Sequence, residues 1–110
     1  MFRIFTTEEF DSDYDRLDGS ERERVNKILR QLKDQGDSVG KELAGVSIFK
    51  EKKFNGKRLY FLVYQTFSVI LVLAISDKKA QQATINRIIA HLADYQSYII
   101  EELRKRSLIY

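Results

Sequence analysis

The chain has 110 residues, of which 44% are hydrophobic and none is cysteine, and its formal net charge is +3. This length predicts one domain, residues 1–110, and the lack of cysteine excludes a disulfide framework and a thiolate metal site. No stretch reaches the roughly 18 apolar residues of a membrane-spanning helix, so we expect a cytoplasmic protein with no membrane partner.

The first part of the chain predicts a short strand followed by two helices. The segment "FRIF", residues 2–5, alternates apolar and polar side chains as a strand does. Apolar residues then recur at helical spacing over residues 10–17 and again over residues 25–32. Ser20 and Glu23 have the spacing of a capping box at the start of the second helix. We expect the two helices to form an antiparallel hairpin.

The second part predicts three strands and a helix. The segment "GDSVGKELAGV", residues 36–46, is rich in glycine and serine and indicates a loop. The segments "VSIFKEKKF" and "RLYFLVYQ" flank Asn55-Gly56, which is a strong hairpin signal. The run "FSVILVLAIS", residues 67–76, is typical of a central strand that is buried on both faces. A single long helix follows, with Ser76 or Asp77 as its cap.

These elements predict an α+β fold. The order is a short N-terminal strand, a helical hairpin, a three-stranded antiparallel meander and a long C-terminal helix. We expect the helices to pack on one face of a mostly antiparallel sheet. The other face of the sheet would then be free to act as a working surface.

Charge is distributed unevenly along the chain. Residues 1–40 carry more acidic than basic side chains, whereas residues 41–79 carry eight cations against three acids. Such asymmetry favours a positive face and a polyanionic partner. The densest cluster lies around the hairpin, where cations and aromatic rings alternate as they do on surfaces that track phosphates and stack bases. Its members are Lys50, Lys52, Lys53, Lys57, Arg58, Tyr60 and Tyr64.

The hairpin turn decides which of these side chains share a face. With a two-residue turn, Lys53 lies opposite Arg58, and Tyr60 is on their face, whereas Lys50, Lys52 and Lys57 lie on the other. With a three-residue turn and a bulge at Gly56, the pairing shifts by one residue. Lys50, Lys52, Arg58 and Tyr60 then line one face. We predict the bulged register, which concentrates the cations in one site.

A second basic pair, Lys78-Lys79, follows the last predicted strand and lies at the start of the long helix, with Gln81 after it. Exposed N–H groups at a helix start attract anions, and Gln81 suits hydrogen bonds to sugar or phosphate. His91, the single histidine, is expected to be a solvent-exposed residue. The acidic residues of "EEFDSDYDRLD" lack the loop spacing of a metal site, so we expect no metal and no cofactor.

Together, these segments resemble the RelE/ParE toxin superfamily of toxin–antitoxin systems, with the RelE-like branch favoured. The resemblance covers residues 2–98 and rests on the loop and strand "GKELAGVSIFKEKKF", on "GKRLYF", on "VILVLAIS" and on "SDKKAQQATI". These segments occur in the superfamily's order. The last of them is similar to a G-D-K-x-x-Q-x-x-x-I segment of RelE-like proteins.

The resemblance implies a toxin that is a translation-dependent mRNA endonuclease and that acts on mRNA on the ribosome. It assigns phosphate contacts in catalysis to Lys50, Lys52, Arg58, Lys78 and Lys79. From the cationic and aromatic pattern itself, we expect Lys53, Lys57, Tyr60 and Gln81 to bind substrate. The attacking group would be a ribose 2′-hydroxyl, and the partner a cognate antitoxin. RelE-like enzymes often have a tyrosine where this chain has Ile85. The alternatives are a ParE-like inhibitor of DNA gyrase and a catalytically inactive RelE-like binding protein.

Overall fold

The computed structural model describes residues 1–109, so Tyr110 lies outside the described residues. Its elements in the first half are β1 (Arg3–Thr6), α1 (Glu8–Asp15), α2 (Gly19–Gln35) and β2 (Lys41–Leu43). Those in the second half are β3 (Val46–Phe54), β4 (Lys57–Tyr64), β5 (Val69–Asp77), α3 (Gln81–Ala90) and α4 (Leu92–Lys105). Short 3-10 turns occupy Gly36–Ser38 and Gln65–Phe67.

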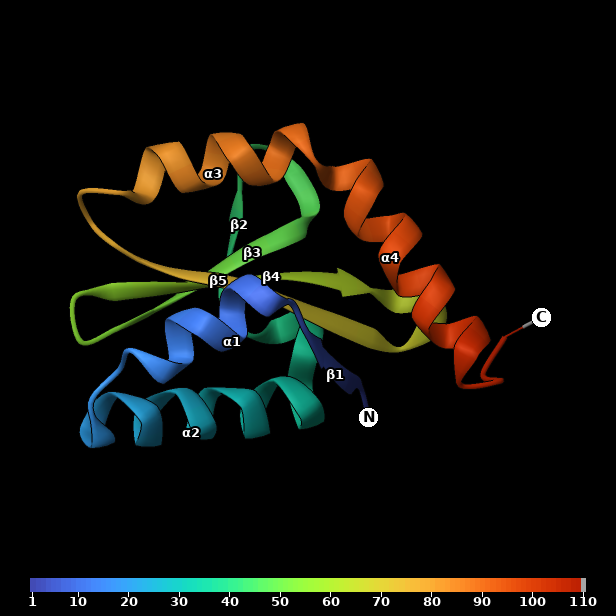
Figure 1. Cartoon of the computed structure of the whole chain (residues 1–110), viewed down its shortest axis with the longest axis horizontal. Helices are drawn as coiled ribbons and strands as arrows, with labels where there is room; N and C mark the ends of the chain where they lie inside the picture. The colour runs from blue at the N-terminus through green and yellow to red at the C-terminus, as the bar shows by residue number, and fades with distance from the viewer. Residues whose placement is uncertain (110) are drawn as a thin grey trace.

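The sheet has five strands in the order β1-β5-β4-β3-β2 (Figure 1). Strands β2 to β5 are antiparallel neighbours, and β1 lies parallel to β5 at one edge. The predicted α+β class, N-terminal strand and helical hairpin are confirmed. Strand β2 is an addition, because the sequence of residues 36–46 indicated only a loop.

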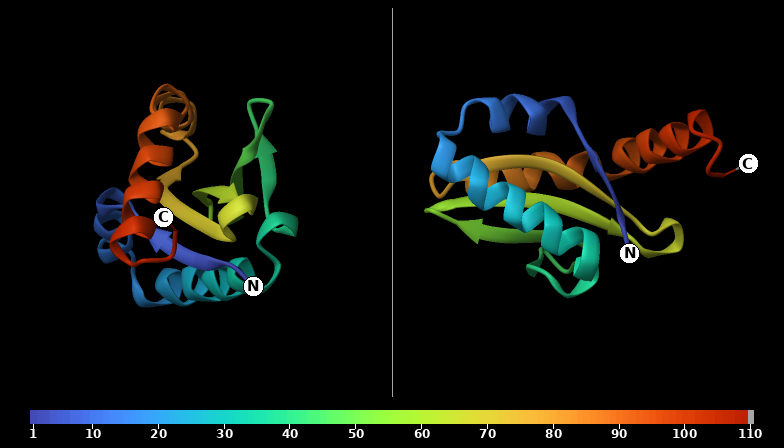
Figure 2. Two further views of the ribbon diagram at one scale, coloured as in Figure 1. Left: turned by 90° about the vertical axis from the view of Figure 1, so that its right-hand side faces the viewer. Right: turned by 90° about the horizontal axis from the view of Figure 1, so that it is seen from below.

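Helices cover both faces of the sheet, and the expectation of one free face is wrong. α1 and α2 lie on one side of the sheet and α3 and α4 on the other, as the views in Figures 1 and 2 agree. The reason lies in β5, whose Ile70 and Val72 join the core under α1 and α2 while Leu71 and Leu73 join the core under α3 and α4. A strand that is apolar on both faces needs a cover on each.

Two separate cores result. The face that carries Lys53, Arg58 and Tyr60 is called the α3 face below, and the opposite face the α2 face. A bulge between β4 and β5 pairs Tyr60 with Ala74 and Phe61 with Val72, so Leu73 is the extra residue. The bulge lets Leu73 and Ala74 both contribute to the core of the α3 face.

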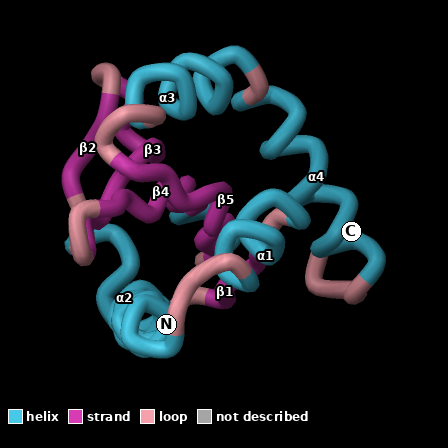
Figure 3. Tube along the Cα trace, turned by 60° about the vertical axis from the view of Figure 1, so that its left-hand side comes forward, coloured by secondary structure: helices cyan, strands magenta, loops and turns pink. Residues whose placement is uncertain are grey.

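The predicted long C-terminal helix is two helices. α3 ends at Ala90 and α4 begins at Leu92, with His91 between them, and the change of direction is visible in Figure 3. The bend carries α4 along the sheet, where Ile99 and Leu103 are buried and the Arg106 guanidinium lies 4.9 Å from the centre of the Phe5 ring. Within residues 1–109, no helix combines the length and the apolar character needed to cross a membrane.

Candidate functional site

The hairpin between β3 and β4 has a two-residue turn. Phe54 pairs with Lys57, and Lys53 with Arg58, so only Asn55 and Gly56 remain outside the ladder. Both turn residues have positive φ, 45° at Asn55 and 74° at Gly56, as a type I′ turn requires. The predicted bulged register is therefore wrong. The Asn-Gly pair satisfies the twist of the two strands without an extra residue.

The tight turn divides the predicted site between the two faces of the sheet. Lys53 and Arg58 share the α3 face with Glu51 and Tyr60, which are the next pair of the ladder on that face. The α2 face receives the other predicted cations of the hairpin, which are Lys50, Lys52 and Lys57. The structure thus brings Arg58 together with Lys53 and Tyr60, but not with Lys50 or Lys52.

Two cations of the α2 face are engaged in structural contacts. The Lys57 ammonium lies 2.8 Å from the Glu21 carboxylate on α2, and this hydrogen bond lowers the pKa of Glu21. Lys50 donates to the backbone carbonyl of Asp37. Glu21 also completes a capping box with Asp18, so α2 begins two residues before the Ser20–Glu23 box that the sequence suggested. These contacts tie the hairpin to α2.

Arg58 is the most unusual polar residue of the α3 face. It is only 7% exposed, yet the one hydrogen bond of its side chain in the described part of the chain is a long one of 3.5 Å to the carbonyl of Gly56. Its Nε has no partner among residues 1–109, and no carboxylate there forms an ion pair with it. A buried guanidinium without an ion-pair partner is costly, and the cost falls when an anion binds.

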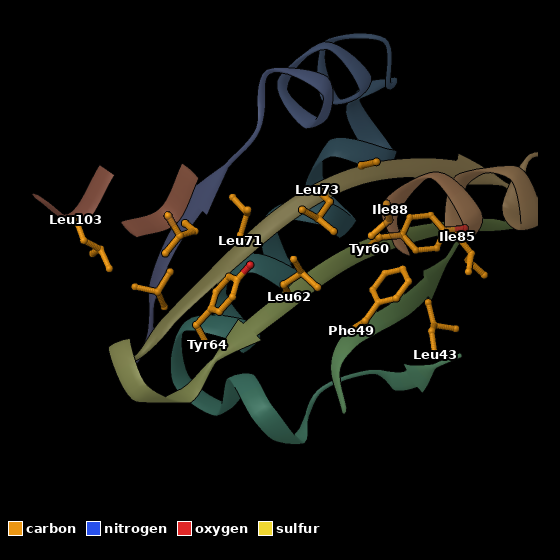
Figure 4. Close-up of a cluster of buried hydrophobic side chains, with 13 residues drawn as sticks. Leu43, Phe49, Tyr60, Leu62, Tyr64, Leu71, Leu73, Ile85, Ile88 and Leu103 are labelled. Atoms are coloured by element: carbon orange, nitrogen blue, oxygen red, sulfur yellow. The ribbon is translucent and has the colours of Figure 1, made fainter. Parts of the chain in front are cut away.

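Tyr60 lies inside the core and not on the surface. Its side chain is fully buried near Phe49, Ile85 and Ile88, as Figure 4 shows. The Ser76 hydroxyl donates to the carbonyl of Asp77, so the Tyr60 hydroxyl donates to Ser76 Oγ at 2.7 Å. Burial raises the pKa of Tyr60. In this arrangement Tyr60 cannot stack on a base, and it stays protonated at neutral pH.

A buried carboxylate completes the α3 face. Glu51 is 4% exposed and accepts a hydrogen bond of 3.1 Å from the side-chain amide of Gln81. This contact joins β3 to the first residue of α3, so the Gln81 amide is engaged within the protein. Sequence reasoning missed Glu51 and Ser76. Glu51 lies two residues from Lys53 on the same strand, so the two side chains share a face. A prediction with the two-residue turn would therefore have placed Glu51 in the site.

The second basic pair lies in a turn and not in a helix. Lys78 and Lys79 are exposed between β5 and α3, and the Asp77 carboxylate accepts from the N–H of Ala80 within that turn. α3 begins only at Gln81, with Ala80 at its N-cap position. The two ammonium groups are thus beyond the end of the strand next to Arg58, which pairs with Ser76 of β5.

The remaining sequence expectations concern His91, the acidic segment and Ile85. His91 is exposed and lies 2.9 Å from Asp94. Among the described residues, no three or more histidine or acidic side chains are grouped to hold a metal ion. Ile85 is 8% exposed and belongs to the core of the α3 face. No tyrosine can therefore act from that position.

The geometry of the α3 face suits an anion more than any other ligand. Arg58 is nearly buried and its Nε has no partner among residues 1–109. Lys53 is an exposed neighbour across the ladder, and Lys78 and Lys79 are exposed in the adjoining turn. Charge-assisted hydrogen bonds to a phosphate are stronger where water is partly excluded. The arrangement can hold a phosphate group and stabilise charge that develops on its oxygens.

No family model matches the sequence, and no curated protein matches it. Solved structures do match. The isolated E. coli RelE toxin has a TM-score of 0.64 at 18% identity, over 80% of this chain and 99% of that one.

Two toxin–antitoxin complexes also match. The intact E. coli RelBE complex has a TM-score of 0.64 at 19% identity, over 70% of this chain and 96% of the matched chain. The RelB–RelE complex from Methanococcus jannaschii has a TM-score of 0.60 at 14% identity, over 73% of this chain and 96% of the matched one. The protein therefore has the fold of the RelE toxins.

Proposed function

We propose that this protein is the toxin of a toxin–antitoxin system and a translation-dependent mRNA endonuclease. The observation that carries the proposal is the Arg58 guanidinium, which is buried and lacks an ion pair within residues 1–109. The fold supports it, since the similar structures are RelE toxins and their complexes with antitoxins. A cognate antitoxin is the expected protein partner, and mRNA on the ribosome is the expected substrate.

The proposed reaction is an attack of a ribose 2′-oxygen on the adjacent phosphorus. The 2′-hydroxyl gives up its proton to solvent water, the new O2′–P bond forms and the P–O5′ bond breaks. The 5′-oxygen leaves and takes up a proton from solvent water. Negative charge grows on the phosphate oxygens, and Arg58 with Lys53 stabilises it. Lys78 and Lys79 contribute further positive charge from the turn. The ribosome would orient the message, which supplies the large entropic part of catalysis.

The test is primer extension on a translated message after induced expression of the protein. We expect growth arrest and new 5′ ends with the wild-type chain, and neither with Arg58→Gln. Growth arrest without new 5′ ends would reject the nuclease. Cleavage that is unchanged in Arg58→Gln would reject the assigned site. Circular dichroism of the purified variant establishes that it is folded.

A specific observation favours the inactive binding protein as the second candidate. Tyr60 is fully buried and Ile85 is a core residue, so neither position offers an exposed tyrosine to stack on a base or to transfer a proton. This candidate predicts no growth arrest and no new 5′ ends. The gyrase-directed alternative predicts altered plasmid supercoiling with intact messages, which the same induced cultures report.

A further inference from the structure

Strand β2 adds a cation to the α3 face that sequence reasoning did not include. Lys41 pairs with Glu51, so its side chain is on the same face as Glu51 and Lys53. Gly40, which precedes it, has φ of 82°, and a Cβ there would lie 2.6 Å from the carbonyl oxygen of Glu51. Glycine at this position therefore lets the chain enter β2 close against β3, and this close entry places Lys41 beside the hairpin.

A shallow pocket of about 320 Å³ connects Lys41 with the hairpin. It is lined by Gly40, Lys41, Glu51, Lys52 and Lys53. Strand β2 begins at Lys41, so β3 has no strand neighbour on that side beyond Glu51, and the pocket lies at this open edge. The pocket thus combines three lysines with one carboxylate, and that carboxylate is nearly buried and held by Gln81. Its exposed rim is positive.

The cations of the α3 face are also available for a ligand. Lys41 and Lys53 are exposed and, like Arg58, have no ion pair within the described chain. The contrast with the α2 face is clear, since Lys50 and Lys57 there are bound to α2 and to the turn that follows it. A lysine without an internal ion pair can bind an external anion without first breaking a contact within the protein.

We propose that Arg58, Lys53 and Lys41 form a row that binds successive phosphates of one strand of RNA. The proposal rests on the proposed function and assigns Arg58 to the reacting phosphate and Lys41 to a flanking one. The row crosses β4, β3 and β2 obliquely. With strands about 4.8 Å apart and alternate residues about 6.6 Å apart, the Cα atoms of its two ends are roughly 12 Å apart. That span exceeds a single phosphate group and suits a short stretch of extended backbone.

The row acts through positive charge that tracks the backbone, so it contributes affinity without base specificity. Lys41 is therefore a positioning residue and does not touch the reacting atoms. A substrate with a single phosphate should use Arg58 and Lys53 alone. Longer strands should gain affinity from Lys41.

The experiment measures binding of a 2′-O-methyl hexanucleotide and a 2′-O-methyl dinucleotide, neither of which can be cleaved, over a range of salt concentrations. For Lys41→Gln, we expect weaker binding of the hexanucleotide and a slope of log Kd against log salt that is smaller by about 0.7, the value for one lost contact to a single strand. Binding of the dinucleotide should be unchanged. Lys41→Arg should restore the wild-type slope.

The matched control is Lys27→Gln, which removes the same charge from the exposed surface of α2 and should leave both slopes unchanged. If Lys41→Gln and Lys27→Gln behave alike while Arg58→Gln weakens binding, the row is wrong and the site around Arg58 stands. If Arg58→Gln also has no effect on either oligonucleotide, the proposed function loses its site as well. Thermal unfolding of each variant shows whether it is folded.

Discussion

Arg58 and Tyr64 each bury polar atoms that find no hydrogen-bond partner among residues 1–109. Leaving a buried donor or acceptor unpaired costs about 1–3 kcal/mol, more if it is charged. The two residues differ in position. Arg58 lies where the turn between β5 and α3 meets the hairpin, whereas Tyr64 lies in the core under α4. An unpaired donor at a ligand site gains a partner when the ligand binds, which gives the Arg58 guanidinium a reason to be there.

Arg58→Met should stabilise the fold while it removes activity. The methionine keeps an apolar chain of similar length and eliminates the buried charge, so the free energy of unfolding should rise by on the order of 1 kcal/mol. Urea denaturation measures this change, and growth after induced expression measures toxicity. A variant that is less stable than the wild type would show that Arg58 supports the fold and is not held for a ligand.

Tyr64→Phe should stabilise the protein by about 1 kcal/mol, because the phenylalanine removes an unpaired buried hydroxyl. The matched control is Tyr60→Phe, which breaks the buried hydrogen bond to Ser76 and should destabilise by about 1 kcal/mol. Denaturant unfolding of both variants provides the comparison. Equal effects with the same sign would contradict this assignment of the two hydroxyls.

Tyr64 also makes stability depend on alkaline pH. Burial raises its pKa from 10.0 to about 12. Below pH 10.0, the pKa of the hydroxyl in the unfolded chain, the hydroxyl is protonated in both the folded and the unfolded state. In that range its titration costs the fold no stability. Between these two values the unfolded chain loses the proton while the folded one keeps it, so stability falls as pH rises. Tyr64→Phe should flatten the loss of unfolding free energy between pH 10 and pH 12, measured by urea denaturation.

At the level of elements, the two-residue turn of the hairpin sets the composition of both faces. Gly56 has φ of 74°, and a Cβ added there would have nothing within 4 Å, so a substitution acts through the backbone alone. Gly56→Ala should destabilise by about 1 kcal/mol, since a left-handed conformation costs roughly 1–2 kcal/mol for an L residue.

The matched control is Gly19→Ala, because Gly19 is the first residue of α2 and also has nothing within 4 Å of an added Cβ. This substitution should leave stability unchanged or raise it by up to about 1 kcal/mol. Thermal unfolding compares the two. A loss of similar size at both positions would show that the turn has no special requirement.

Particular residues explain what the sequence could predict about these elements. Asn55-Gly56 located the hairpin, because the turn signal is local, and the apolar run of β5 located the central strand. The register depended on whether the turn has two residues or three with a bulge at Gly56. The pattern of side chains does not distinguish these two turns. Strand β2 has only three residues and exists through its pairing with β3, so no local pattern marks it.

At the level of the whole molecule, the order of the predicted strands and helices was sufficient to predict the fold class. It was not sufficient to predict that helices cover both faces of the sheet. The alternation of Ile70 and Val72 with Leu71 and Leu73 contains the information that both faces are covered. The predicted candidate site was partly wrong because the predicted hairpin register was wrong. Arg58, Lys53 and Tyr60 were predicted and do share a face, whereas Lys50 and Lys52 were assigned to catalysis and lie on the other. Lys41 was not predicted as a site residue because strand β2, which carries it, was not predicted.

We propose that RNA binding and cleavage take place on the α3 face of the hairpin. The most direct test of this claim compares two double variants of equal charge change, Lys53→Gln with Arg58→Gln and Lys50→Gln with Lys57→Gln, by primer extension on a translated message. We predict that the first double variant yields no new 5′ ends and that the second cleaves as the wild type does. Cleavage that survives the first and disappears in the second would contradict the claim.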